Sequence, residues 1–165
     1  MPDVFDRLKA LLEQEKADFR VIEHEPEGRS EQISKIRGND PSQAAKAMVV
    51  AVKTGEGRKF VLAILPGNRR VDFAGIAKAV GGKKAALAAP EEARRLTECE
   101  MGAVPPFSFN EELILVVDPD LLVHDKLAFN AGRLDRSMFL ATQSYIAVAK
   151  PTVAPIAGAA IGATA

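Results

Sequence analysis

A single lysine, Lys46, interrupts an otherwise apolar run of residues and is the first side chain to consider for chemistry. Two alanines precede it, and residues 47–52 are all apolar and rich in valine, which is typical of a buried strand. An ammonium group at the start of such a strand either extends to water or is held there to contact a ligand. This stretch alone favours the first interpretation and leaves the second open.

A loop rich in glycine and proline, residues 99–109, is the second candidate. Gly102 and the pair Pro105-Pro106 give this loop a stiff backbone with few hydrogen-bonding needs of its own. Such a backbone can direct N–H groups toward a ligand oxygen. Because loops of this composition are usually plain turns, the loop becomes a candidate site only in combination with Lys46.

An Asp-Pro-Asp sequence follows an expected apolar strand and raises two alternatives. It resembles the nucleophile motif of haloacid-dehalogenase phosphatases, but Leu122 stands where that motif usually has Thr or Val. The other alternative is a metal cluster of Asp118, Asp120, His124 and Asp125. A turn after a buried strand explains these residues more simply, so the sequence favours neither a phosphatase nor a metal site.

The sequence offers few residues for covalent or metal catalysis. A single cysteine, Cys99, excludes an internal disulfide, and with only two histidines it leaves too few soft ligands for structural zinc. The His24-Glu25 pair is followed by Pro26, which breaks the helix that a zinc-protease motif requires. Since no Ser-His-Asp or Cys-His arrangement is apparent, we expect no metal, no cofactor and no protein nucleophile.

Composition indicates one globular domain with an uneven distribution of charge. The 165 residues are 47% hydrophobic and 27% charged, with a net charge of zero. Residues 33–89 carry eleven Lys/Arg against three Asp/Glu, whereas residues 90–125 carry two against nine. A basic face that meets a phosphate backbone is therefore open, beside the alternative of charges balanced in space. The N-terminus has acids where a signal peptide has bases, and no apolar run could span a bilayer, so we expect a cytoplasmic protein without membrane contact.

Helix-like and strand-like patterns alternate along the chain, which predicts a mixed α/β fold. Helices are expected over residues 4–12, 30–37, 72–80, from 90 and from 142, and strands over 19–22, 47–52, 60–65, 113–117 and 138–140, with a weaker strand at 83–88. The strands at 47–52 and 60–65 should form a hairpin. We expect one domain over residues 1–150, followed by a flexible tail, 151–165, of uncharged Pro, Gly, Ala and Thr.

Three segments together resemble the YbaK/ProX family, relatives of the editing domain of bacterial prolyl-tRNA synthetase. They are Lys46 after Gln-Ala-Ala, the segment Leu65 to Asp72, and Leu96-Thr97 followed by the Gly-x-x-x-Pro loop, Gly102 to Pro106. The segment FNAGRLDRS, residues 129–137, is closest to the YeaK branch. One departure is Glu98, because relatives often have glycine after Leu-Thr.

The resemblance implies a barrel-like mixed β-sheet surrounded by helices, and a trans-editing hydrolase that cleaves the ester of mischarged aminoacyl-tRNA. Substrate-assisted hydrolysis would then need positioning rather than a nucleophile. We expect Lys46 to hold the terminal adenosine phosphate or the acyl oxygen, and Gly102 to contribute to the oxyanion contact. The remaining residues expected to contact substrate are Ala103, Val104, Pro105, Pro106, Asn130, Gly132, Arg133 and Asp135.

The partners implied by the resemblance are mischarged tRNA and, in addition, an aminoacyl-tRNA synthetase or an elongation factor. A different class of function stays open, namely a non-catalytic module that binds aminoacyl-tRNA or a synthetase and regulates it. The presence of both Lys46 and the intact Gly102 loop favours the enzyme.

Overall fold

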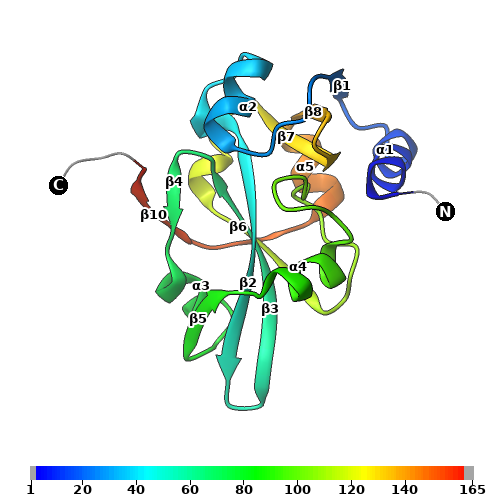
Figure 1. Cartoon of the computed structure of the whole chain (residues 1–165). Coiled ribbons are helices and arrows are strands. Elements are labelled where there is room, and N and C mark those ends of the chain that lie inside the picture. Colours follow the sequence, from blue (N-terminus) through cyan, green and yellow to red (C-terminus); the bar gives the residue numbers. More distant parts are fainter. Residues whose placement is uncertain (1–2, 162–165) are drawn as a thin grey trace.

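The computed structural model describes residues 3–161, and its elements alternate much as the sequence patterns predict (Figure 1). The helices are α1 (Val4–Gln14), α2 (Ser30–Arg37), α3 (Phe73–Ala79), α4 (Pro90–Thr97) and α5 (Thr142–Ala149), with single helical turns at Pro41–Gln43 and Pro119–Leu121. The strands are β1 (Phe19–Glu23), β2 (Ala45–Thr54), β3 (Gly57–Pro66), β4 (Arg69–Val71), β5 (Lys84–Leu87), β6 (Leu113–Val117), β7 (Lys126–Arg133), β8 (Arg136–Ala141), β9 (Thr152–Val153) and β10 (Ala157–Ala160). None of the described helices is long and apolar enough to cross a membrane.

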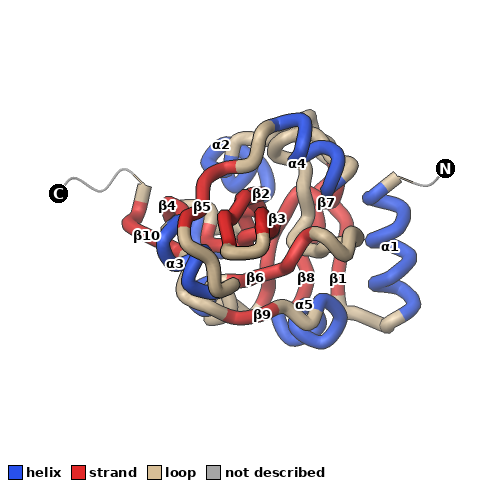
Figure 2. Tube along the Cα trace, turned by 90° about the horizontal axis from the view of Figure 1, so that it is seen from below, coloured by secondary structure: helices blue, strands red, loops and turns tan. Residues whose placement is uncertain are grey.

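The described strands form three sheets, with the helices on the outside (Figure 2). The largest has the order β5-β2-β3-β6-β9 and combines antiparallel and parallel pairs, while the others have the orders β1-β8-β7 and β10-β4. The predicted mixed α/β class is therefore confirmed. The predicted barrel-like closure is not found among residues 3–161, because the sheets of β2 and β7 meet only at an isolated bridge between Ala44 and Ala128.

The hairpin of β2 and β3 is the centre of the fold and carries Lys46, which pairs with Leu65. Alternate residues of β2 point to opposite faces of the sheet, so Ala45 and Val49 belong to one apolar core and Val50 belongs to another. Strand β5 pairs with β2 only from Val50 to Lys53. The first half of β2 therefore has an open edge on this side, and the candidate site lies along it.

Residues 151–161 are ordered parts of the sheets, so the prediction of a flexible tail is wrong for them. Strand β9 pairs with β6 in parallel, and β10 pairs with β4 in antiparallel. Ile156, between these strands, is fully buried. Composition misled the prediction because an uncharged Ala/Gly segment shows no sign of the backbone pairing that distant strands provide. The tail residues 162–165 lie outside the described residues.

The carboxylate of Asp118 anchors this C-terminal segment. One oxygen accepts hydrogen bonds from the N–H groups of Ile156 and Ala157, at 2.8 and 2.9 Å, and the other accepts one from the N–H of Asp120. Asp120 itself forms an ion pair with Arg69 at 3.0 Å. Within residues 3–161, no group of three His, Cys, Asp or Glu side chains could hold a metal ion. These contacts support the interpretation of the Asp-Pro-Asp sequence as a turn.

Candidate active site

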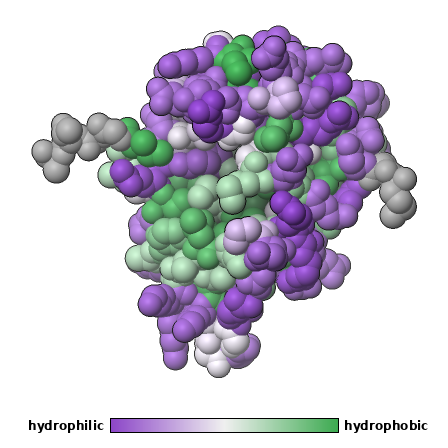
Figure 3. Space-filling model, in the orientation of Figure 1, coloured by the Kyte–Doolittle hydropathy of each residue, from purple (hydrophilic) through white to green (hydrophobic). Residues whose placement is uncertain are grey.

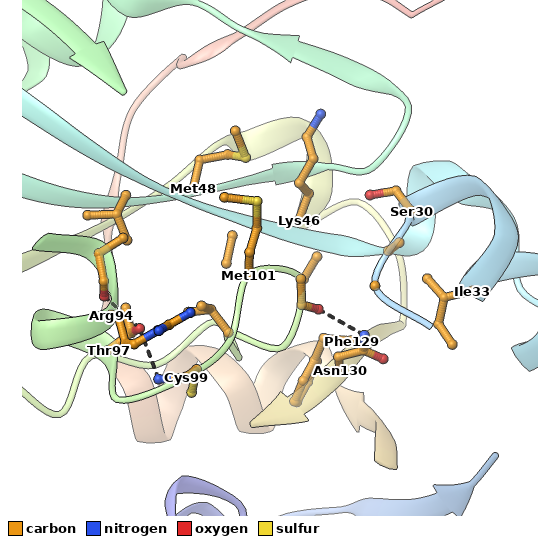
Figure 4. A pocket seen from close by; sticks show the side chains of 18 of the residues that line it. Ser30, Ile33, Lys46, Met48, Arg94, Thr97, Cys99, Met101, Phe129 and Asn130 are labelled. Atoms are coloured by element: carbon orange, nitrogen blue, oxygen red, sulfur yellow. Dashed lines mark hydrogen bonds between the residues drawn. The ribbon is translucent and has the colours of Figure 1, made fainter. Parts of the chain in front are cut away.

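A cavity of about 350 Å³ opens along the free edge of β2 (Figure 4). Helix α2 contributes Ser30, Ile33 and Arg37, which are spaced three and four residues apart and so share one helix face. Helix α4 contributes a second face that includes Arg94 and Thr97. The loop after α4 and the middle of β7, at Phe129 and Asn130, complete the wall. A volume of this size is in the range typical of small-molecule sites.

The cavity has an open, apolar rim and a closed end lined by small and buried residues. At the rim, Met101 is 81% exposed and Leu87 is 55% exposed. At the closed end, Ile33, Ala44 and Phe129 are almost fully buried. Figure 3 shows hydrophobic surface across the middle of this face, between hydrophilic regions above and below. The rim can therefore contact a flat apolar group, while the closed end admits only a small one.

The charges that line the cavity all have one sign. Arg37, Lys46 and Arg94 reach its surface, and none of the described lining residues is Asp, Glu or His. None of these three cations has an ion-pair partner among residues 3–161. The cavity is thus suited to an anionic ligand that is rich in hydrogen-bond acceptors. It also contains no carboxylate or imidazole that could serve as a general base.

Lys46 lies on β2 with its ammonium group directed away from Asn130 (Figure 4). The Nζ atom donates a hydrogen bond to the backbone carbonyl of Arg69. Burial lowers the pKa of Lys46 below its ordinary value, and the neighbouring Arg70 lowers it further. Since an ammonium has three donors, Lys46 retains donors for a ligand. Its position beside Arg70 makes this part of the cavity the most suitable for a phosphate.

Gly102 occupies a position that requires glycine. Its φ is +87°, in the left-handed region. A Cβ atom at this position would lie 2.8 Å from both Cα and the carbonyl oxygen of Gly28, which belongs to the segment before α2. Two backbone segments therefore cross in direct contact, and any side chain at Gly102 would push them apart.

The Gly102 loop is held by three hydrogen bonds that leave two of its N–H groups free. The carbonyl of Gly102 accepts a bond from Asn130 Nδ2 at 2.8 Å, and the carbonyl of Ala103 accepts one from the N–H of Gly132 at 2.8 Å. The N–H of Ala103 donates to the carbonyl of Glu100. The N–H groups of Gly102 and Val104 find no partner among residues 3–161, and both residues line the cavity. They are available to an oxyanion.

Asn130 holds this loop in place through a buried polar network. Its Nδ2 donates to the carbonyls of Gly102 and Glu27, both at 2.8 Å, so both amide protons are committed. Its Oδ1 accepts a bond from Ser137 Oγ at 3.0 Å. Ser137, which is fully buried, also contacts His24 Nε2 at 2.7 Å. With its donors in use, Asn130 orients the loop and has little capacity to bind a ligand directly.

Glu98 follows Leu96-Thr97, where relatives often have glycine, and its backbone adopts a left-handed conformation that favours glycine. Glu98 ends α4 with a φ of +58°, and its N–H donates to the carbonyl of Arg94. Its carboxylate forms an ion pair with Arg7 of α1 at 3.0 Å. The entrance of the Gly102 loop therefore keeps a left-handed turn despite the departure from the family pattern.

Of the ten residues that the sequence predicted for the site, four line the cavity: Lys46, Gly102, Val104 and Asn130. The other six do not line it: Ala103, Pro105, Pro106, Gly132, Arg133 and Asp135. Ala103, Pro105 and Pro106 are buried behind the loop, and Arg133 pairs with Asp135 at 3.2 Å. Gly132 has a φ of +87°, and a Cβ there would lie 2.9 Å from the backbone of α1. These six residues therefore lie outside the wall of the cavity.

Cys99 lines the cavity but is a poor nucleophile. It is buried, and this burial, assisted by the charge of Glu98, raises the pKa of its thiol to about 12. The thiol is therefore protonated at neutral pH, and the side chain packs in a small buried cluster with Val4 and Ala103.

Part of the basic segment is neutralised by the acidic segment that follows it. Arg58 pairs with Glu92 at 2.8 Å, and Arg69 pairs with Asp120. The cations that line the cavity are not among these pairs, so their positive charge is available to a ligand in the cavity.

A family model described as the aminoacyl-tRNA editing domain matches residues 24–148. The chain therefore belongs to the aminoacyl-tRNA editing domain family. Over 146 residues it is 49% identical to the multifunctional Ser/Thr-tRNA deacylase ProXp-y of Escherichia coli, covering 88% of this chain and 87% of that protein. It is also 31% identical over 88 residues to a proline–tRNA ligase of Bacillus cytotoxicus, covering 53% of this chain and 15% of that enzyme.

The fold is shared with a solved structure assigned as a candidate trans-editing enzyme for prolyl-tRNA synthetase. The TM-score is 0.79 at 24% sequence identity, covering 96% of this chain and 99% of the other. The family model and the relative at 49% identity confirm the predicted family, together with the class of activity that defines it, aminoacyl-tRNA editing by hydrolysis of an aminoacyl ester.

Proposed function

We propose that this cavity binds the aminoacylated 3′ end of a tRNA and positions its ester for hydrolysis, with seryl and threonyl groups as the preferred acyl groups. The observation that carries the proposal is the pair of N–H groups without a partner among residues 3–161, on Gly102 and Val104, in a cavity whose charged lining residues are all cations. The relative at 49% identity is named for Ser/Thr-tRNA deacylation, which supports the choice of acyl group.

Gly102 and Val104 would stabilise the oxyanion that develops as water attacks the ester carbonyl. Preorganised backbone donors are most effective where the charge forms in the transition state and where they need no reorganisation. Asn130 and Gly132 provide this preorganisation by fixing the two carbonyls of the same loop.

Lys46 would hold the phosphate of the terminal adenosine. Its ammonium lies beside Arg70, directed away from Asn130, and retains donors beyond the bond to the Arg69 carbonyl. Of the two roles expected from the sequence, phosphate and acyl oxygen, this geometry favours the phosphate. The apolar rim around Met101 would contact the base of the same nucleotide.

The proton of the attacking water would pass to the substrate. The described lining residues offer no carboxylate or imidazole, and the Cys99 thiol stays protonated. The neighbouring hydroxyl of the terminal ribose can orient the water and relay its proton. An aminoacyl ester is already activated, so positioning of this kind can supply much of the rate.

The partners of this activity would be mischarged tRNA and, for tRNA selection, an aminoacyl-tRNA synthetase or an elongation factor. The cavity accounts for the acceptor end only, and the remaining cations outside it could contact the tRNA backbone with an affinity that falls as salt rises.

The test is the release of amino acid from seryl-, threonyl-, alanyl- and cysteinyl-tRNA, compared with spontaneous hydrolysis of each. We expect release from seryl- and threonyl-tRNA well above the spontaneous rate. If all four tRNAs are bound but none is cleaved faster than it hydrolyses spontaneously, the chain is a binding module and the proposed function fails.

A further inference from the structure

Arg37 is a largely buried cation for which the fold provides no counter-charge. It is the last residue of α2, and no carboxylate lies within ion-pair distance of it among residues 3–161. Burial lowers its pKa to about 10, so the guanidinium is still charged at neutral pH. A buried charge without a partner costs free energy of folding. Because this charge does not stabilise the fold, ligand binding is the role to consider for Arg37.

The contacts of Arg37 leave most of its hydrogen-bond donors unused. Its Nε donates to Asn39 Oδ1 at 2.9 Å, and its Nη1 donates to Ser137 Oγ at 3.3 Å. A guanidinium has five N–H donors in a fixed plane. Because Arg37 lines the cavity, donors remain for a ligand there.

Arg37 lies at the closed end of the cavity, close to the Gly102 loop. Ser137 links the guanidinium to Asn130, and Asn130 holds the Gly102 carbonyl, through hydrogen bonds of 3.0 and 2.8 Å. The wall of the cavity also includes the small, buried side chains of Ala44 and Ala45. If the ester carbonyl lies against the loop, the amino-acid side chain extends into this closed end.

We propose that Arg37 selects the acyl group by donating a hydrogen bond to its side-chain hydroxyl. The assignment rests on the proposed function. A hydroxylated side chain of the size of serine or threonine fits the small closed end and provides an acceptor to the cation. Alanine leaves the remaining donors of the guanidinium without a partner, and polar groups left unsatisfied in this way allow a site to reject a substrate that lacks the hydroxyl.

The test compares kcat/KM on seryl-, threonyl- and alanyl-tRNA for the wild type and for Arg37→Met. The wild type should prefer the two hydroxylated groups over alanyl by at least about tenfold. In Arg37→Met, we expect the seryl and threonyl values to fall by about tenfold or more, while the alanyl value changes by less than about threefold. Arg20→Met is the matched control, because Arg20 is exposed, packs on Phe139 and lies outside the cavity. Arg20→Met should show the same preference for seryl- and threonyl-tRNA over alanyl-tRNA as the wild type.

Thermal unfolding shows whether each variant is folded. If Arg37→Met does not fold, Arg37→Gln replaces it, because glutamine is neutral and keeps a polar end group that can contact Asn39 and Ser137. An equal fall on all three tRNAs would overturn the assignment in favour of a phosphate contact or a role in loop geometry. The assignment would also be overturned if Arg37→Met kept the wild-type ratio of kcat/KM for seryl- or threonyl-tRNA to kcat/KM for alanyl-tRNA. It would be overturned as well if the wild type showed no preference for the hydroxylated groups. If the wild type cleaves none of the three, the proposed function fails and the assignment fails with it.

Discussion

Lys46→Met is expected to lower kcat/KM for seryl-tRNA by at least about thirtyfold, which corresponds to the loss of one desolvated charge contact with a phosphate. The same substitution should leave the free energy of unfolding at neutral pH unchanged or raise it. Burial and Arg70 depress the pKa of Lys46, so the ammonium form is penalised in the folded protein and methionine removes this penalty. Steady-state deacylation and denaturant unfolding measure the two effects separately.

The pH dependence of this stability difference follows from the sign of the pKa shift. The pKa of Lys46 is lower in the folded protein than its ordinary value of 10.5. Above pH 10.5 the side chain is neutral in both states and its burial carries no charge penalty. As the pH falls through the folded pKa, the side chain becomes charged and the folded protein loses that stability. The advantage of Lys46→Met should therefore be complete below the folded pKa of Lys46 and should shrink as the pH rises toward 10.5. A variant that is inactive because it is less stable than the wild type would show that Lys46 is structural.

Gly102→Ala is expected to lower kcat by at least about a hundredfold, because a displacement of about 1 Å at reacting groups can have that effect. A Cβ at Gly102 would lie 2.8 Å from the backbone of Gly28, and the φ of +87° is unfavourable for alanine. The loop must therefore shift, and the N–H groups of Gly102 and Val104 shift with it. Single-turnover deacylation with saturating enzyme measures this loss.

Gly55→Ala is the matched control for Gly102→Ala. Gly55 lies in the turn of the β2–β3 hairpin, its φ is not positive, and a Cβ there would meet no atom within 4 Å. Its activity and thermal stability should be close to those of the wild type. If Gly102→Ala is folded and deacylates at the wild-type rate, the loop does not bind the oxyanion.

Local patterns predicted most of the fold because the signals were close in sequence. Asp3 accepts a hydrogen bond from the N–H of Asp6, as a helix cap should, and Leu8 and Leu12 are fully buried at helical spacing. The β2–β3 hairpin follows from two valine-rich runs around a glycine turn. The C-terminal strands could not be predicted in this way, because their hydrogen bonds come from β4, β6 and Asp118.

The candidate site was predicted in part for the same reason. Lys46 and Gly102 are unusual within their own segments, and both line the cavity. In the sequence, Arg37 is only one of the eleven Lys/Arg of residues 33–89, although its spacing from Ser30 and Ile33 places all three on one face of α2. Its significance depends on Ser137, a hundred residues away in the chain, and on the absence of an acidic partner among the described residues, which no local pattern reveals.

In the proposed mechanism, the protein positions an activated ester and the substrate supplies the hydroxyl group that relays the proton. The most direct measurement is the deacylation rate of seryl-tRNA ending in 2′-deoxyadenosine, compared with seryl-tRNA ending in adenosine. We predict a loss of at least about a hundredfold with the deoxy substrate, the usual contribution of a positioned acid–base group. Equal rates on the two substrates would contradict the account, because a protein group would then have to do this work.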